Sequence, residues 1–123
     1  MSHEWLQGNI HNLGNTKVGN ERITIPALLD IAWAAGIFEG EGHSRYNGRT
    51  SEASISQKDR WILDKLKSLF GGRVYGPYKK KGRAKYRIYA WVCLGPRARG
   101  FLMTIYSFLS PRRKIQAFNT LNW

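Results

Sequence analysis

An apolar helix is the first element that the hydrophobic pattern predicts. It should begin near Ile25, with Pro26 in its first turn, and extend to about Glu39. Bulky apolar side chains are spread all around it, whereas small residues gather toward its end, before Gly40 and Gly42. A helix that is apolar on every side is expected to be buried, and small residues allow another helix to approach closely.

Pairs of strands alternate with helices in the rest of the predicted order. Strand pairs are expected at residues 43–57 and 73–94, and helices are expected at residues 59–70, 97–109 and 112–121. Asn47-Gly48 predicts the turn of the first strand pair, and residues 76–83 are expected to form the loop of the second. Gly71-Gly72 should end the second helix, and Ser110 should cap the last one. This order predicts an α+β domain with an antiparallel sheet.

Residues 1–25 differ in composition from the remainder. Glycine and asparagine are frequent between residues 8 and 20, and both favour turns and irregular backbone. We therefore expect an irregular or flexible N-terminal arm over residues 1–25 and a single domain over residues 26–123.

The charge of the chain indicates what it binds. The formal net charge is +12, from 20 Lys and Arg against 8 Asp and Glu, and all but two of the basic residues follow position 32. A small basic domain usually binds a polyanion. An anionic membrane would require a basic amphipathic helix or a lipidation signal, and neither is evident. A nucleic acid is therefore the expected partner, and a membrane is not.

Cys93 is the only cysteine, which excludes an internal disulfide and suits a reducing compartment. No apolar run approaches the length of a membrane span, and the first residues lack the pattern of a secretory signal. An intracellular protein is expected, in the cytoplasm of a bacterial or phage-infected host or in an organelle.

Two glutamates at the end of the first helix are the most informative residues. Glu39 and Glu41 lie between glycines where the helix end already carries partial negative charge, so a bound cation would offset their repulsion. Glycines also allow a phosphate backbone to approach closely. The alternative is a glycine-capped helix whose terminal glutamates are simply solvated.

Residues 34–42, Ala-Ala-Gly-Ile-Phe-Glu-Gly-Glu-Gly, resemble the LAGLIDADG motif of homing endonucleases, with glutamate at both acidic positions. Further segments similar to the family follow in its order, at residues 54–58, 61–66, 71–75 and 108–116. The resemblance covers about residues 31–118. It implies the family's α-β-β-α-β-β-α(-α) domain, whose curved antiparallel sheet binds DNA.

A single motif implies a homodimer rather than a monomer with two motifs. The resemblance then implies a site-specific endonuclease that cuts double-stranded DNA at a pseudo-palindromic target with Mg²⁺, or with another divalent metal such as Mn²⁺. Glu41 and the Gly42 carbonyl would bind the metal, and Gln57 would order the catalytic water. Lys114, or alternatively Arg113, matches the family's basic residue near the active site. Hard carboxylate oxygens are ligands that Mg²⁺ prefers, which agrees with these assignments.

Two surfaces are expected on this scaffold. The motif helices of two copies should pack together through Ala32, Ala35, Gly36 and Glu39. DNA contacts are expected from the two hairpins, at Arg45, Asn47, Arg49, Lys79, Lys80, Lys81, Arg83, Lys85 and Arg87.

Strand alternation predicts which residues of the second hairpin share a face. It places Lys85, Arg87, Tyr89 and Trp91 on one face of their strand. Trp61, Tyr75 and Trp91 are expected in the core rather than stacked on bases.

The alternative function is a catalytically silent module that binds DNA or intron RNA on the same scaffold. The presence of Glu41, Gln57 and the basic residues 112–114 favours the enzyme.

Overall fold

The computed structural model describes residues 17–18, 21–22, 25–80 and 83–121. The chain divides into two compact units, residues 1–33 and 34–123. In the first unit, β1 (Lys17–Val18) pairs antiparallel with β2 (Glu21–Arg22), and α2 (Ile25–Glu41) begins. The arm predicted over residues 1–25 falls mostly outside the described residues, so it stays a prediction, as does its boundary at residue 26.

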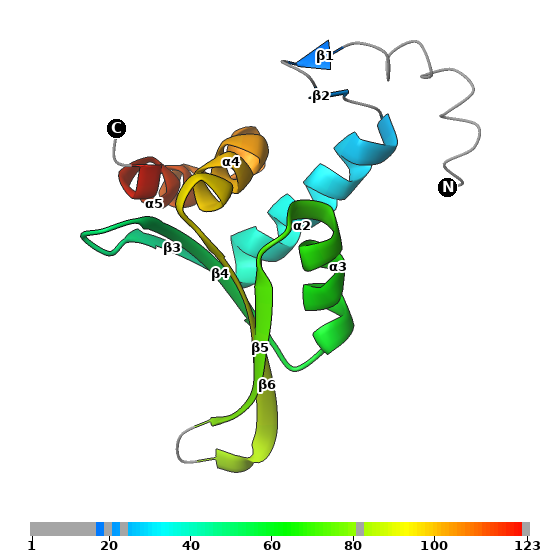
Figure 1. Ribbon diagram of the computed structural model, residues 1–123, viewed down its shortest axis with the longest axis vertical. Helices are drawn as coiled ribbons and strands as arrows, with labels where there is room; N and C mark the ends of the chain where they lie inside the picture. Colours follow the sequence, from blue (N-terminus) through cyan, green and yellow to red (C-terminus); the bar gives the residue numbers. More distant parts are fainter. Residues whose placement is uncertain (1–16, 19–20, 23–24, 81–82, 122–123) are drawn as a thin grey trace. The chain divides into compact units, whose positions relative to one another are not determined.

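A four-stranded antiparallel sheet organises the second unit (Figure 1). Its strands are β3 (Gly42–Tyr46), β4 (Ser51–Gln57), β5 (Arg73–Lys80) and β6 (Arg83–Leu94). Their spatial order is β3-β4-β6-β5, so the two hairpins join through the β4–β6 ladder. The α+β class and the antiparallel sheet predicted from the sequence are therefore confirmed.

Helices cover one face of this sheet. They are the end of α2, α3 (Arg60–Phe70), α4 (Gly95–Ile105), the 3₁₀ turn η1 (Tyr106–Phe108) and α5 (Pro111–Leu121). Buried strand residues alternate with exposed ones along β3 and β4, as expected when a single face is packed. Ala53, Ile55, Trp91 and Cys93 point into this layer. The opposite face carries no helix of residues 34–121, and we refer to it as the open face.

Aromatic rings fill the centre of the core. Phe101 makes edge contacts with Phe38, Phe70 and Trp91, at ring-centroid distances of 5.7, 4.9 and 4.9 Å. Such pairs add to the apolar area that each ring buries. They join α2, α3 and β6 around α4, so the helix that carries the acidic residues is anchored in the core of the domain.

Gly72 shows how closely the backbone approaches this core after α3. Its φ of +87° is in the region that favours glycine, and a Cβ there would lie 2.7 Å from the Val92 carbonyl oxygen. The Trp91 indole Nε1 donates to the Gly71 carbonyl oxygen at 2.8 Å, which satisfies that buried group. The predicted end of α3 at Gly71-Gly72 is therefore confirmed.

The loop predicted over residues 76–83 is wrong. β5 continues to Lys80 and β6 begins at Arg83, so the second hairpin is longer than expected. The Gly76-Pro77 pair is tolerated because β5 is an edge strand, where a residue without an N–H removes no interior ladder bond. The register shifts between Tyr75 and Tyr78, which accommodates the pair.

Burial corrects three further expectations. Trp91 is fully buried as predicted, but Trp61 is 58% exposed and Tyr75 is 41% exposed, so neither belongs to the core. The motif helix is not buried on every side either, because Gly36 and Gly40 are exposed. The small residues of this helix therefore leave a surface that the described residues do not cover.

Candidate active site and nucleic-acid interface

The acidic end of α2 leads directly into the sheet. Glu41 is the last residue of the helix, and Gly42 is the first residue of β3. Gly42 has to be glycine, because a Cβ at this position would overlap the Phe38 ring. Among the described residues, none donates a hydrogen bond to the exposed Glu41 carboxylate or forms an ion pair with it. The helix end is thus fixed by packing, while its terminal carboxylate remains available.

A buried arginine from α5 binds the carbonyl groups at this end of α2. Arg113 is 8% exposed, and its Nη1 donates to the Gly42 carbonyl oxygen at 2.6 Å. Its Nε donates to the Glu39 carbonyl oxygen at 3.1 Å, and its guanidinium lies 5.8 Å from the Phe38 ring centroid. A helix C-terminus leaves carbonyl groups without partners and carries partial negative charge, and a cation there satisfies both.

Glu39 also connects α2 to α5, but here the side chain belongs to α2 and its partner lies at the start of α5. Its carboxylate accepts hydrogen bonds from the Ser110 backbone N–H and hydroxyl, both at 2.8 Å. Ser110 precedes α5, and its Oγ accepts from the Arg113 N–H at 3.4 Å, as a cap residue does. The Ser110 backbone hydrogen bond, followed by its hydroxyl, lowers the pKa of Glu39 from 4.5, and Arg113 and Arg112 lower it further. We call these four residues, Glu39, Gly42, Ser110 and Arg113, the α2–α5 junction.

The remaining predicted catalytic residues lie on elements attached to this junction. Gly42 pairs with Ile55, so Gln57, two residues further along β4, lies at the same end of the sheet as Glu41. Lys114 follows Arg113 on α5, and its Nζ lies 5.6 Å from the Tyr106 ring centroid. Because Arg113 is buried and its Nε and Nη1 bind the junction carbonyls, Lys114 is the better candidate for a cation that meets substrate.

The two predicted metal ligands, Glu41 and the Gly42 carbonyl, do not form a complete metal site within one chain. The described residues contain no group of three His, Cys, Asp or Glu side chains that could hold a metal ion. Of the two predicted ligands, the Gly42 carbonyl already accepts from Arg113, whereas the Glu41 carboxylate is unpartnered by any described residue. A hard carboxylate oxygen suits Mg²⁺, which commonly binds through one or two carboxylates together with phosphate oxygens. The donor chemistry fits, provided that other ligands come from a second copy and a phosphate.

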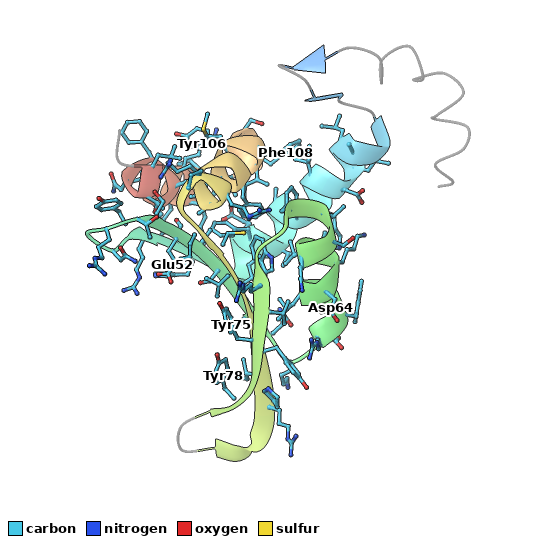
Figure 2. All side chains as sticks on the ribbon, viewed as in Figure 1. Glu52, Asp64, Tyr75, Tyr78, Tyr106 and Phe108 are labelled. Atoms are coloured by element: carbon cyan, nitrogen blue, oxygen red, sulfur yellow. The ribbon has the colours of Figure 1, made fainter. Side chains whose placement is uncertain are left out.

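The open face of the sheet presents polar and aromatic side chains that the sequence interpretation missed. Four of these side chains are exposed, and the strand register places them on the open face, away from the helices: His43, Arg73, Tyr75 and Tyr78. Figure 2 shows Tyr75 and Tyr78 on the same side of the sheet as Glu52, away from Asp64 of α3. Alternation places Arg73 and Tyr75 on one face of β5, but the register shift that puts Tyr78 on the same face could not be found by counting positions.

The alternation predicted for β6 holds for Arg87, Tyr89 and Trp91, and the face that they share is the helix-covered one rather than the open face. Trp91 faces the helices, so Tyr89 and Arg87 share the helix-covered side, and Arg60 of α3 lies 5.4 Å from the Tyr89 ring centroid. The irregularity between Lys79 and Lys80 interrupts the alternation beyond Arg87. Lys81 lies outside the described residues. The DNA contacts predicted for Lys79, Lys80, Lys81, Arg83, Lys85 and Arg87 stay predictions.

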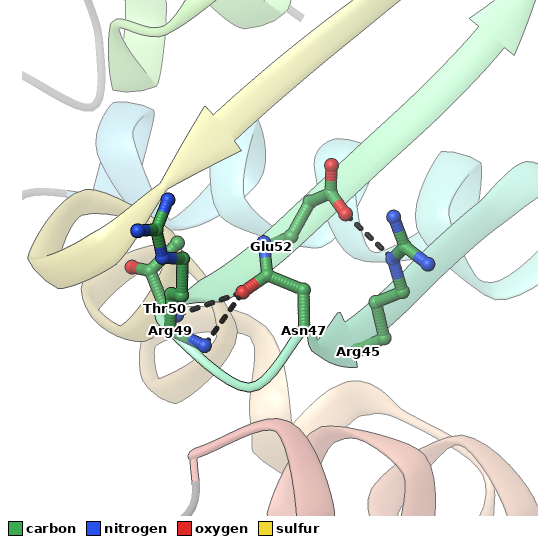
Figure 3. A network of polar contacts seen from close by, with 5 residues as sticks. All are labelled: Arg45, Asn47, Arg49, Thr50 and Glu52. Atoms are coloured by element: carbon green, nitrogen blue, oxygen red, sulfur yellow. Dashed lines mark hydrogen bonds and ion pairs between the residues drawn. The ribbon is translucent and has the colours of Figure 1, made fainter.

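The tip of the first hairpin is held by an asparagine (Figure 3). The Asn47 Oδ1 accepts hydrogen bonds from the backbone N–H groups of Arg49 and Thr50, both at 2.9 Å. This occupies the oxygen that asparagine needs to recognise adenine with two hydrogen bonds, and it leaves only Nδ2. Arg49 and Arg45 extend from this turn with exposed side chains, as a DNA-contacting hairpin requires.

The predicted subunit interface is only partly accessible. Ala32 and Gly36 are exposed on α2, whereas Ala35 is 2% exposed and the Glu39 carboxylate is bound to Ser110. Gly40 is also exposed, and a Cβ at Gly36 or Gly40 would meet no atom within 4 Å. Within residues 34–41 the exposed small residues of α2 are Gly36 and Gly40, four positions apart, and we call these two the small-residue strip.

No helix among the described residues is long and apolar enough to span a membrane.

Comparisons with solved structures identify the fold. The homing endonuclease I-CvuI is similar to this chain in two structures, one with its target (Sro1.3) and 2 mM Ca, and one with the I-CreI target and 2 mM Mg, where the DNA is not cleaved. These are 17% and 18% identical, with TM-scores of 0.62 and 0.63, and each match covers 80% of this chain and 68% of the other.

A third similar structure is the archaeal intron-encoded homing endonuclease I-Vdi141I complexed with DNA. It is 20% identical, with a TM-score of 0.52, and the match covers 70% of this chain and 61% of the other. No family model and no curated protein match the sequence. The fold is that of the LAGLIDADG homing endonucleases, as the resemblance in the sequence predicted.

The lowered pKa of Glu39 gives a test of the α2–α5 junction. Because the folded-state pKa lies below 4.5, the charged carboxylate stabilises the fold above that pH, and this contribution is lost as the pH falls through the folded-state value. Glu39→Gln should lower the free energy of unfolding by about 1 kcal/mol at pH 7, the usual value of a helix cap. Urea unfolding at pH 7 and pH 3 should show the difference shrinking in acid. An equal difference at both pH values would contradict this assignment.

Proposed function

We propose that two copies of this chain form a metal-dependent, site-specific endonuclease that cuts double-stranded DNA at a pseudo-palindromic target. The observation that carries the proposal is the exposed Glu41 carboxylate, which no described residue binds, at a helix end held by Arg113. A carboxylate kept free beside a buried cation suits a metal ligand better than a structural role. The fold, shared with homing endonucleases solved with DNA, supports the same function.

Each candidate residue of one chain would have a separate role in hydrolysis of the phosphodiester bond. Glu41 provides a hard oxygen ligand, and Gln57, at the same end of the sheet, can hydrogen-bond a water through its amide. Lys114 provides a mobile cation for the charge that develops on the phosphate. When bound, Mg²⁺ would polarise the phosphate and lower the pKa of the attacking water. Arg113 positions the site through the Gly42 and Glu39 carbonyls without reaching the DNA.

The dimer would form through the exposed small-residue strip of α2. Glycine in a helix interior costs about 0.5–1 kcal/mol relative to alanine, and no described residue lies close enough to Gly36 or Gly40 to require it. Close approach of a second α2 helix explains both residues, and it would bring two Glu41 carboxylates together. The open face of each copy would then bind one half of the target. Such an enzyme works where DNA is present, in a cell or an organelle.

Removing the carboxylate tests the enzymatic proposal. Glu41→Gln should reduce Mg²⁺-dependent double-strand cutting by about 100-fold or more while DNA affinity is kept, because a metal ligand is lost and the fold is not disturbed. Asp64→Asn on α3, whose carboxylate is exposed and ion-paired with Arg60, is the matched control and should cut at the wild-type rate.

Cleavage of a duplex library with and without EDTA is the measurement. Tight binding by the wild-type protein without any metal-dependent cut would identify the silent binding module instead. Cutting by Glu41→Gln at the wild-type rate would remove Glu41 from the active site.

A bulky residue on the strip tests the dimer. Gly36→Leu should raise the dimer dissociation constant at least about tenfold, because the side chain would separate the two α2 helices. Gly100→Leu on α4 is the matched control, since its glycine is also exposed and unobstructed. Sedimentation equilibrium measures both constants. A wild-type protein that stays monomeric at micromolar concentration with DNA present would contradict the proposed dimer.

A further inference from the structure

One acidic side chain lies on the open face of the sheet. Glu52 of β4 is the only Asp or Glu in strands β3 to β6. It lies directly across the β3–β4 ladder from Arg45, and the Arg45 Nε donates to its Oε2 at 2.7 Å (Figure 3). On a surface that binds a polyanion, a carboxylate weakens phosphate contacts. General affinity for DNA therefore does not account for it.

The hydrogen bond leaves a defined part of the arginine available. With Nε engaged, Nη1 and Nη2 remain, and no described residue accepts a hydrogen bond from either. The Arg45 side chain is 60% exposed and that of Glu52 is 23% exposed, so the carboxylate lies deeper and supports the guanidinium from below. The turn held by Asn47 begins two residues after Arg45, which fixes the backbone that carries it.

We propose that Arg45 and Glu52 act as one unit that recognises guanine in the major groove of the target. This inference rests on the proposed function and assigns part of its specificity. Guanine presents two acceptors there, O6 and N7, which match the two free guanidinium nitrogens. Adenine presents a donor in place of O6, which would oppose a guanidinium N–H. Glu52 fixes the plane of the guanidinium and disfavours its use as a phosphate contact.

A plain surface ion pair is the competing account. Such a pair contributes little to stability. If it makes no contact with a base, its removal would leave base preference unchanged. A guanine-recognising pair instead gives about 5- to 150-fold discrimination at one base pair of each half-site. The two accounts therefore differ in sequence preference rather than in folding.

The experiment is a binding selection from a randomised duplex library, without metal, for wild type, Arg45→Lys, Glu52→Gln and the control Arg49→Gln. Arg49 extends from the same turn, and no described residue pairs with its side chain. Wild type should select guanine at one position in each half-site. Arg45→Lys should lose this preference, and Glu52→Gln should weaken it while raising affinity for nonspecific DNA. Arg49→Gln should lower affinity for all duplexes and keep the preference.

Two outcomes would overturn the proposal, and they are distinguishable. Selection of a defined target with the same base preferences in wild type, Arg45→Lys and Glu52→Gln would contradict the guanine assignment alone. Failure of the wild-type protein to enrich any duplex would contradict the proposed function, and this inference with it.

Discussion

The burial of the Arg113 guanidinium against the end of α2 is the interaction on which the site depends. A buried cation is costly unless it is well bound, and Arg113 is bound by two backbone carbonyls, the Gln116 side chain and the face of Phe38. The same guanidinium offsets the partial negative charge of the helix end. The Glu39 carboxylate completes the junction by accepting hydrogen bonds from Ser110, the residue that caps α5. As a result, α2, β3 and α5 are fixed to one another at Gly42, the residue that follows Glu41.

This arrangement separates the polar groups that are bound within the chain from those that stay exposed. Within residues 39–42, Glu39 is held by Ser110 and the Gly42 oxygen is held by Arg113, so Glu41 is the group left for solvent and ligands. On the open face, Arg45 is held by Glu52 through one nitrogen and keeps two for a partner. In both places an internal contact orients the side chain or backbone that would meet DNA. Such preorganisation reduces the entropic cost of binding.

Much of the fold could be predicted from the sequence because local signals agree with the tertiary structure. Three features depend only on residues that are close in sequence, and all three could be predicted: the hydrophobic spacing of α4, the glycines after α3 and the turn at Asn47-Gly48. The second hairpin could not be predicted fully, because an edge strand tolerates Gly76-Pro77 only in its tertiary context. The exposure of Trp61 and Tyr75 likewise depends on which strand and helix faces meet, which periodicity alone does not determine.

The candidate site was predicted less evenly. The motif located Glu39, Glu41 and Gly42, but the sequence could not say which of them the chain itself would engage. That distinction, and the difference between Arg113 and Lys114, depends on contacts between residues about 70 positions apart. The pair formed by Arg45 and Glu52 was missed because it depends on strand register.

The most direct test of the account compares the unfolding free energies of Arg113→Gln and Lys114→Gln in urea. If Arg113 is the structural cation of the junction, its replacement should cost about 2–4 kcal/mol, because buried carbonyl groups lose their donor. Lys114→Gln should cost less than about 0.5 kcal/mol, as expected for a side chain whose Nζ no described residue binds by a hydrogen bond or ion pair. Equal losses, or a larger loss for Lys114→Gln, would contradict the division between a structural Arg113 and an available Lys114.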